Sequence, residues 1–248
     1  MKKIFYLIIA IVVIAHTNSC TGYKPIFGSS NLNFEIAREL MVLNQLKPNK
    51  ISEQNILNIF KNTPKENFLP EKLRNICYSD NNINLFKNRG YLKNLHLAQI
   101  IKYAEINKSD KVLHVGGLTG YLSLIIAKFC NEIIIIEENE NLIDKLKNNL
   151  KTFKILNAEI VKSKLDYGYG IEAPYDLIII DSPVYNFNNK LVEQLNPNQG
   201  RLIYIQKLKN DLSKAFKLTR NSDAHTNEYL FDVFSSFSSD EIKSTFKL

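Results

Sequence analysis

The sequence predicts an α/β fold with a doubly wound, mostly parallel sheet, and three observations support that prediction. A short apolar segment, 112–115, leads into a glycine-bearing turn, 116–120, and then into an amphipathic segment. A run of isoleucines at 133–136 follows and ends in Glu137, about 20 residues after Gly116. Continuous apolar strands that alternate with helical segments are typical of parallel sheets covered on both faces.

The order strand, glycine turn, helix, strand and acid also indicates a ligand site. Backbone N–H groups of such a turn, together with a helix N-terminus, can bind a nucleotide-like ligand. An acid in the position of Glu137 commonly binds ribose hydroxyls, although it can also be a strand-end acid that faces water. The segment 112–137 therefore resembles the first half of a nucleotide-binding domain.

The same alternation continues along the chain. The expected strands are 111–115, 133–137, 159–161, 177–181 and 201–206, and the expected helices between them are 120–129, 140–150 and 187–195. The tail segments 215–219 and 228–234 are expected to add an antiparallel pair.

Helical spacing of apolar residues predicts two helices before the sheet, at 34–46 and 53–61. Pro48 is expected to end the first helix, and Ser52 is expected to be the N-cap of the second. Three further segments are expected to be a short helical turn at 73–78, a polar loop at 80–91 and a helix at 92–104.

Residues 1–32 are expected to form a leader and linker. Lys2 and Lys3 precede a 12-residue apolar run, which is shorter than the roughly 20 residues of a spanning helix and fits a signal-peptide core. The segment 17–20 loosely resembles the lipidation box of bacterial lipoproteins, so Cys20 is the residue that would carry the lipid. An uncleaved N-terminal extension is the alternative.

The composition argues against a nucleic-acid partner. The net charge of +7 comes from 27 Lys and only 5 Arg, and the lysines are scattered. Sites that recognise nucleic acid depend on arginine forks and clustered charge, so we expect a coding bias toward lysine rather than a nucleic-acid partner. The cysteines Cys20, Cys77 and Cys130 match no zinc or redox spacing.

From about residue 33 to residue 248 the chain resembles bacterial protein-L-isoaspartate O-methyltransferases. The matching segments occur in the family's order. They are the helix that begins Asn33-Phe34-Glu35, the segment 63–70 (T-P-K-E-N-F-L-P, like V-P-R-E-x-F-V-P), the turn 112–121, the A-P-Y-D at 173–176 and the Q-L-x-P-x-x-G-R-L at 194–202.

This resemblance implies a seven-stranded, Rossmann-like methyltransferase fold with an N-terminal helical cap. The cap and a substrate loop would span 33–104, and the methyltransferase domain would span 105–248. It also implies S-adenosylmethionine as the cofactor, and isoaspartyl carboxylates of damaged proteins or peptides as the substrates. A cytoplasmic monomer with no metal is expected on the same basis.

The cofactor residues implied by the resemblance are His114, Gly116, Gly117, Gly120, Glu137, Ser163 and Asp181. Several of these positions depart from the family pattern. Leu118 replaces the middle glycine, which can require positive φ, unless Gly117 shifts the turn by one residue. His114 replaces a glutamate, and it is either a cofactor contact or a strand-end histidine with internal partners.

Two other positions are also altered. Ser163 lies where the family has an aspartate for the adenine, unless Asp166 takes that role through a change of register. Asp181 ends a strand where the family usually has threonine and alanine, and it is either a ligand contact or a helix-capping acid.

The expected substrate loop, 88–94, lacks the family's serine and threonine. Arg89 and Tyr91 are the candidate catalytic residues, and Lys93 is a further donor, because a cation or hydroxyl can hold a substrate carboxylate. Solvated loop charges are the alternative.

Three functional hypotheses follow. The first is a working isoaspartyl methyltransferase with a rebuilt site. The second is a catalytically inactive, membrane-anchored relative that acts as a binding module, which an exported chain would favour because S-adenosylmethionine is expected inside the cell. The third, a nicotinamide-dependent oxidoreductase, is disfavoured because the segments before residue 104 match the methyltransferases.

Overall fold

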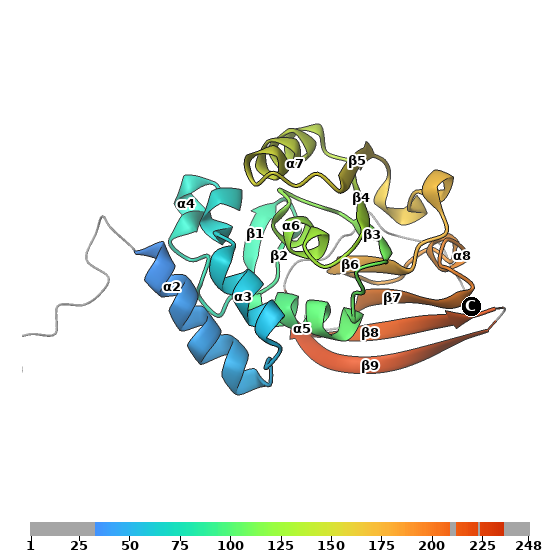
Figure 1. The fold of residues 1–248 in the computed structure, drawn as a ribbon, viewed down its shortest axis with the longest axis horizontal. Coiled ribbons are helices and arrows are strands. Elements are labelled where there is room, and N and C mark those ends of the chain that lie inside the picture. Colours follow the sequence, from blue (N-terminus) through green and yellow to red (C-terminus); the bar gives the residue numbers. More distant parts are fainter. Residues whose placement is uncertain (1–32, 209–211, 223, 236–248) are drawn as a thin grey trace, which may run out of the picture. The chain divides into compact units, whose positions relative to one another are not determined.

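The computed structural model describes residues 33–208, 212–222 and 224–235 (Figure 1). From Phe34 onward these residues belong to one compact unit. The predicted leader, including Cys20, lies outside the described residues. None of the helices in the described ranges is long and apolar enough to cross a membrane.

A seven-stranded sheet forms the centre of the unit, in the order β5-β4-β3-β6-β7-β8-β9. Its strands are β3 (Lys111–Val115), β4 (Glu132–Glu137), β5 (Ala158–Lys162), β6 (Leu177–Val184), β7 (Asn198–Lys207), β8 (Leu212–Asn221) and β9 (Ala224–Phe234). The first five strands in this order are parallel, and β8 and β9 are antiparallel. The predicted fold and the predicted antiparallel tail are therefore confirmed.

Alternate residues of the central strands pack on opposite faces of the sheet, as the period of a strand requires. Ile133 and Ile135 join the larger core with α5 (Asn94–Ala104), α6 (Tyr121–Ala127) and α7 (Glu140–Thr152). Ile134 and Ile136 join a smaller core on the other face. That face is covered by α8 (Lys190–Glu193) and by short 3-10 turns at Leu165–Tyr167 and Gly170–Glu172.

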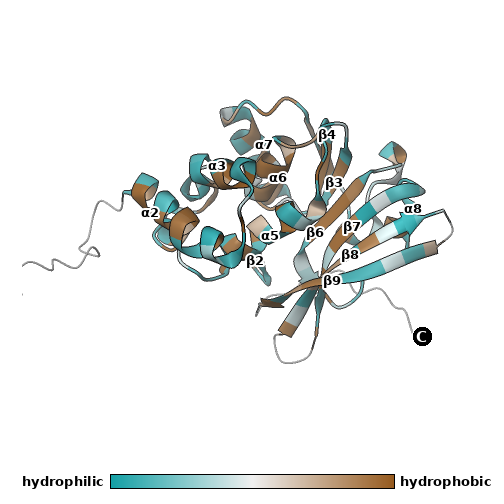
Figure 2. Ribbon diagram, turned by 60° about the horizontal axis from the view of Figure 1, so that its bottom comes forward, coloured by the Kyte–Doolittle hydropathy of each residue, from teal (hydrophilic) through white to brown (hydrophobic). Residues whose placement is uncertain are grey.

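Figure 2 shows how the burial of each strand is reflected in the hydropathy of its residues. Strand β6, which is buried along its whole length, is largely apolar, whereas β8 and β9 mix apolar and polar residues. A central parallel strand lies between two layers, while strands toward the edge face solvent on one side. The continuous isoleucine runs of the sequence reflect this burial on both faces.

The N-terminal cap contains α2 (Phe34–Met41), which continues as a π turn (Val42–Leu46) and a 3-10 turn (Lys47–Asn49). It also contains α3 (Gln54–Asn62) and α4 (Glu71–Arg74). The prediction that Ser52 caps the second helix is wrong. Glu53 occupies the N-cap, without a side-chain hydrogen bond to the helix. The helical turn expected at 73–78 lies at Glu71–Arg74 instead.

The segment expected to be a loop is a hairpin formed by β1 (Ile83–Phe86) and β2 (Arg89–Tyr91). Gly90 lies opposite Asn84, and a Cβ atom there would be 2.0 Å from the carbonyl oxygen of Ile83. Only glycine allows the two strands to come this close. The hairpin was not expected from the sequence, because residues 80–91 are mostly polar and the two strands are short. The strands also lie outside the main sheet.

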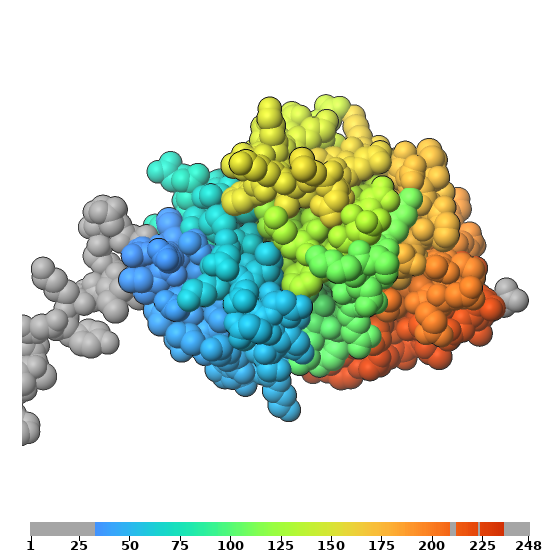
Figure 3. Space-filling view, in the orientation of Figure 1, coloured from blue at the N-terminus to red at the C-terminus, as the bar shows by residue number. Residues whose placement is uncertain are grey.

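The cap packs directly against the helices of the larger core. In the space-filling view the blue and cyan cap residues lie against the green and yellow-green residues of the sheet's helices (Figure 3). Helix α3 contacts α5, and the 3-10 turn Lys65–Phe68 contacts α7. The cap therefore covers the loop that follows β3.

Lys65 is wholly buried where the cap meets the sheet's helices. Its Nζ donates a hydrogen bond to Asn94 Oδ1 at 2.8 Å and lies 5.5 and 5.2 Å from the ring centroids of Tyr91 and Tyr121. Burial lowers the pKa of this amine to about 7, because desolvation disfavours the charged form.

This burial predicts a pH-dependent stability. Between about pH 7 and 9 the unfolded chain keeps the Lys65 proton while the folded chain loses it, so the free energy of unfolding rises with pH. A Lys65→Met variant should lose this contribution, which is at most about 1.4 kcal/mol per pH unit. Urea titrations at several pH values measure the slope, with Lys61→Met, an exposed lysine of α3, as the control. Equal slopes in wild type and Lys65→Met would contradict the prediction.

Candidate active site

The carboxyl ends of β3, β4 and β6 lie side by side and carry the candidate site. The register pairs Val115 with Ile136 on one side and with Ile180 on the other. Open α/β sheets bind ligands beyond such carboxyl ends. Glu137, Asp181 and the turn 116–120 are brought together here, as the sequence predicted.

The turn after β3 takes its shape from three residues with positive φ. These are Gly116 at 84°, Leu118 at 51° and Gly120 at 94°. Leu118 adopts a left-handed conformation of the kind that glycine takes most readily, and its side chain is wholly buried in the larger core. The alternative in which Gly117 shifts the turn is therefore wrong. A Cβ atom on Gly117 would lie 2.4 Å from Ile135 Cγ2, so this glycine is needed for packing.

Glu137 is wholly buried and accepts hydrogen bonds from five N–H groups. Arg89 donates from Nη1 to Oε1 and from Nη2 to Oε2, both at 2.8 Å. The backbone nitrogens of Leu118, Glu138 and Asn139 donate at 3.0, 3.1 and 3.2 Å. A carboxylate has about four acceptor positions, so all of them are used within the chain. Glu137 thus connects the turn after β3, the start of the next helix and β2.

Arg89 comes from the predicted substrate loop, but it points inward and is only 4% exposed. Its Nη2 lies 3.0 Å from the position that a Cβ atom on Gly116 would occupy. Burial lowers the pKa of the guanidinium, but the hydrogen bonds and charge of Glu137 outweigh burial and raise the pKa overall. The alternative of a solvated loop charge is wrong for Arg89, because its partner is a buried carboxylate of the same chain.

Tyr91, the second candidate from this loop, is also buried. Its hydroxyl lies 2.8 Å from Thr119 Oγ1 and accepts hydrogen bonds from the backbone nitrogens of Thr119 and Tyr121 at 3.3 and 3.2 Å. Burial raises the pKa of this phenol, so it stays protonated at neutral pH. Tyr91 therefore occupies N–H groups at the start of α6 that a ligand would otherwise meet.

His114 has a partner at each ring nitrogen. Nδ1 lies 2.8 Å from Ser123 Oγ, and Nε2 lies 3.4 Å from Asp181 Oδ1. All three side chains are buried. The set has the composition of a nucleophilic triad, but the hydroxyl of Ser123 is enclosed within α6 and the sheet, so it cannot reach a substrate.

This geometry agrees with the expectation that His114 is a strand-end histidine with internal partners. Asp181 lies within β6 rather than before a helix, so the helix-capping alternative is wrong. Ser123 was not predicted from sequence, because nothing in its surroundings on α6 distinguishes it from an ordinary core serine.

Ser163 and Asp166 lie at the side of the site, after β5. Ser163 is half-buried and its backbone nitrogen donates to the Glu137 carbonyl oxygen at 3.2 Å. Asp166 is half-buried in the following 3-10 turn. Their roles toward a ligand stay predictions. Among the described residues no cluster of His, Cys, Asp and Glu could hold a metal ion.

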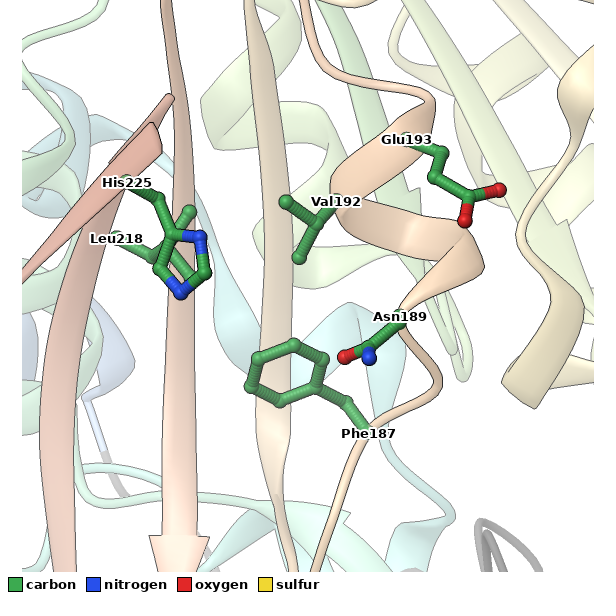
Figure 4. Close-up of a pocket in the computed structure, with 6 residues that line it drawn as sticks. All are labelled: Phe187, Asn189, Val192, Glu193, Leu218 and His225. Carbon is green, nitrogen blue, oxygen red and sulfur yellow. The ribbon is translucent and has the colours of Figure 1, made fainter. Parts of the chain in front are cut away.

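A hollow lies between α8 and strands β8 and β9 (Figure 4). It is lined by Phe187, Asn189, Val192, Glu193, Leu218 and His225. Leu218 pairs with Leu202 near the start of β7, so this hollow lies toward the amino ends of the parallel strands. The candidate site at Glu137 and Asp181 is at the opposite edge.

The sequence of the chain matches a known protein family. The family model of protein-L-isoaspartate(D-aspartate) O-methyltransferase matches residues 37–233. The chain belongs to this family.

Individual members of this family are also similar to the chain. The chain is 26% identical over 166 residues to a protein-L-isoaspartate O-methyltransferase of Methanoculleus marisnigri, covering 67% of this chain and 75% of the relative. It is 27% identical over 210 residues to protein-L-isoaspartate O-methyltransferase 1 of Rhodopseudomonas palustris, covering 84% and 85%. A solved protein-L-isoaspartate O-methyltransferase has the same fold, with a TM-score of 0.69 and 22% identity, over 83% of this chain and 67% of that one.

The family implies S-adenosylmethionine as the cofactor, but Glu137 already has hydrogen-bond partners within the chain. The acid is in the place where ribose hydroxyls are expected, but Arg89 and three backbone N–H groups use both of its oxygens. Leu118 and Tyr91 are also turned into the protein. In the conformation described, the acceptor positions of Glu137 are therefore used by groups of the chain itself.

Leu118 yields a testable prediction about the turn. Leu118→Gly removes backbone strain of about 1–2 kcal/mol, but it deletes a buried leucine side chain worth roughly 2–5 kcal/mol. The free energy of unfolding should therefore fall by about 2 kcal/mol, and by at most about 4 kcal/mol. Chemical denaturation measures this loss, and Leu118→Ala, which keeps the strain, should be less stable than Leu118→Gly. A Leu118→Gly variant more stable than wild type would contradict the packing that we describe.

Proposed function

We propose that the protein transfers a methyl group from S-adenosylmethionine to the free carboxylate of isoaspartyl residues in proteins or peptides. The observation that carries this proposal is the match of the family model over residues 37–233. A further support is that Glu137 and the turn 116–120 lie together at the carboxyl ends of β3 and β4, where open α/β sheets bind ligands. The two named relatives carry the same activity in their names.

The chemistry makes modest demands on the protein. A carboxylate is already ionised at neutral pH, so no strong base is needed. The site must orient this carboxylate and exclude water from it. The buried Tyr91 phenol and the buried His114 are thus not required as bases, which agrees with their internal partners.

The substrate carboxylate still needs a donor. Of the three residues expected to supply one, Arg89 and Tyr91 have buried partners, and Lys93 lies before α5 with its side chain 24% exposed. Its Nζ lies 3.2 Å from Asp80 Oδ2, an exposed carboxylate. A substrate carboxylate can replace such an exposed partner at little cost, so Lys93 is the donor that we propose.

A transfer assay tests both parts of the proposal. With S-adenosylmethionine labelled in its methyl group, an isoaspartyl peptide should gain a base-labile methyl ester, and the same peptide with ordinary aspartate should not. Lys93→Ala should raise KM for the peptide about tenfold, because a charge-assisted hydrogen bond is lost. Lys72→Ala, an exposed lysine of α4, is the control. Absence of ester from the isoaspartyl peptide at saturating cofactor would refute the activity.

The Arg89–Glu137 pair favours a second candidate function. A methyltransferase fold in which Glu137 is already paired within the chain can act as a binding module without transferring methyl groups. This candidate ranks second, because it has no counterpart in the family match. The transfer assay also separates the two candidates.

We propose that the protein is a cytoplasmic monomer, as the family resemblance suggests, because S-adenosylmethionine is expected inside the cell. The alternative is a lipoprotein-type leader in residues 1–32 that anchors the chain to a membrane. The support for this alternative is the basic start, the short apolar run and Cys20. Fractionation of cells tests the location. The wild type should be recovered in the cytoplasm with Met1 retained, whereas recovery with membranes that is lost in Cys20→Ala would refute the cytoplasmic location and favour the anchor.

A further inference from the structure

The arrangement of donors around Glu137 points to what Arg89 does in this fold. The two terminal nitrogens of Arg89 donate to the two oxygens of Glu137, one to each, at 2.8 Å. A ribose diol that binds a carboxylate presents the same pattern, with two neighbouring hydroxyls donating to two oxygens. The guanidinium fork therefore satisfies Glu137 in the way that the sugar of a nucleoside would.

The position of Arg89 supports this equivalence. Its Nη2 lies against Gly116, at 3.0 Å from the place of a missing Cβ. Glycines in such turns allow a ligand to approach the backbone. Here the group that approaches is a side chain of the same protein.

Arg89 is also held in a way that permits exchange. It lies in β2, a three-residue strand of a two-stranded hairpin that is separate from the seven-stranded sheet. Its Nε is buried and has no hydrogen-bond partner among the described residues. An unsatisfied buried donor costs free energy, and a buried ion pair gains little net stability after desolvation. Withdrawal of Arg89 would leave the main sheet intact.

We infer that Arg89 is an internal substitute for the ribose diol at Glu137, which competes with adenosine-containing ligands and so sets their affinity. The inference rests on the proposed function for the identity of the ligand. If Arg89 is paired with Glu137 for about nine-tenths of the time, the apparent Kd is raised about tenfold over that of the open site.

Titration calorimetry of the full-length protein with S-adenosylmethionine tests the inference. Arg89→Ala should bind at least about tenfold more tightly than the wild type. Arg74→Ala is the matched control, because it removes an exposed arginine of α4 and should bind as the wild type does. Thermal unfolding without ligand shows whether each variant is folded.

A second variant and a second pair of ligands keep the test decisive if Arg89→Ala does not fold. Arg89→Ala leaves the buried Glu137 carboxylate without its ion partner, which can prevent folding. Arg89→Gln keeps one donor for Glu137 while removing the fork and the charge, so it should fold and should also bind more tightly than the wild type.

The second pair of ligands is adenosine and 2′,3′-dideoxyadenosine. Loss of Arg89 should improve binding of adenosine and leave binding of the dideoxy analogue, which lacks the diol, unchanged.

The outcomes separate this inference from the proposed function. Folded Arg89 variants that bind no more tightly than wild type overturn the inference, and equal gains for adenosine and its dideoxy analogue overturn it as well. If methyl transfer occurs in the wild type with unchanged affinity in the variants, the inference falls while the proposed function stands. If the variants bind more tightly but no protein transfers methyl groups, the inference stands and the proposed function falls.

Discussion

The buried ion pair between Arg89 and Glu137 is the interaction on which the site depends. Glu137 ends β4, and its oxygens also accept from the turn after β3 and from the start of α7. A carboxylate with no exposed surface is tolerated only when it is paired and hydrogen-bonded. The pair therefore fixes two loops and a hairpin in one arrangement, and it decides whether the acid is available to a ligand.

The cap contributes the second half of the closed site. Lys65, Tyr91 and Tyr121 form one packed group, in which the amine lies over both rings and the Tyr91 hydroxyl meets the start of α6. Thr119 links the same turn to the cap through its hydroxyl, which donates to the Phe68 carbonyl oxygen. The β2 hairpin and the cap are thus joined by direct contacts through Tyr91 and Thr119.

The partners of the individual arginines are informative in a way that the overall composition is not. In a chain with 27 Lys and 5 Arg, three of the arginines, Arg38, Arg89 and Arg201, pair with carboxylates in buried or half-buried positions. A planar guanidinium can bind both oxygens of a carboxylate, whereas lysine cannot. Of these three, Arg89 donates to both oxygens of its partner, whereas Arg38 and Arg201 each donate to one.

Sequence by itself determined the fold, because the isoleucine runs, the glycine turn and their spacing specify strands buried on both faces and the order of the elements. It also placed Glu137, Asp181 and the turn 116–120 at one edge of the sheet. Only the tertiary structure decided which groups meet there. The partners Arg89 and Glu137 are 48 residues apart, as are many pairs that never touch, and Ser123 resembles any core serine. Burial and partner choice arise from packing, so whether an acid is free or already satisfied is a property of the folded molecule.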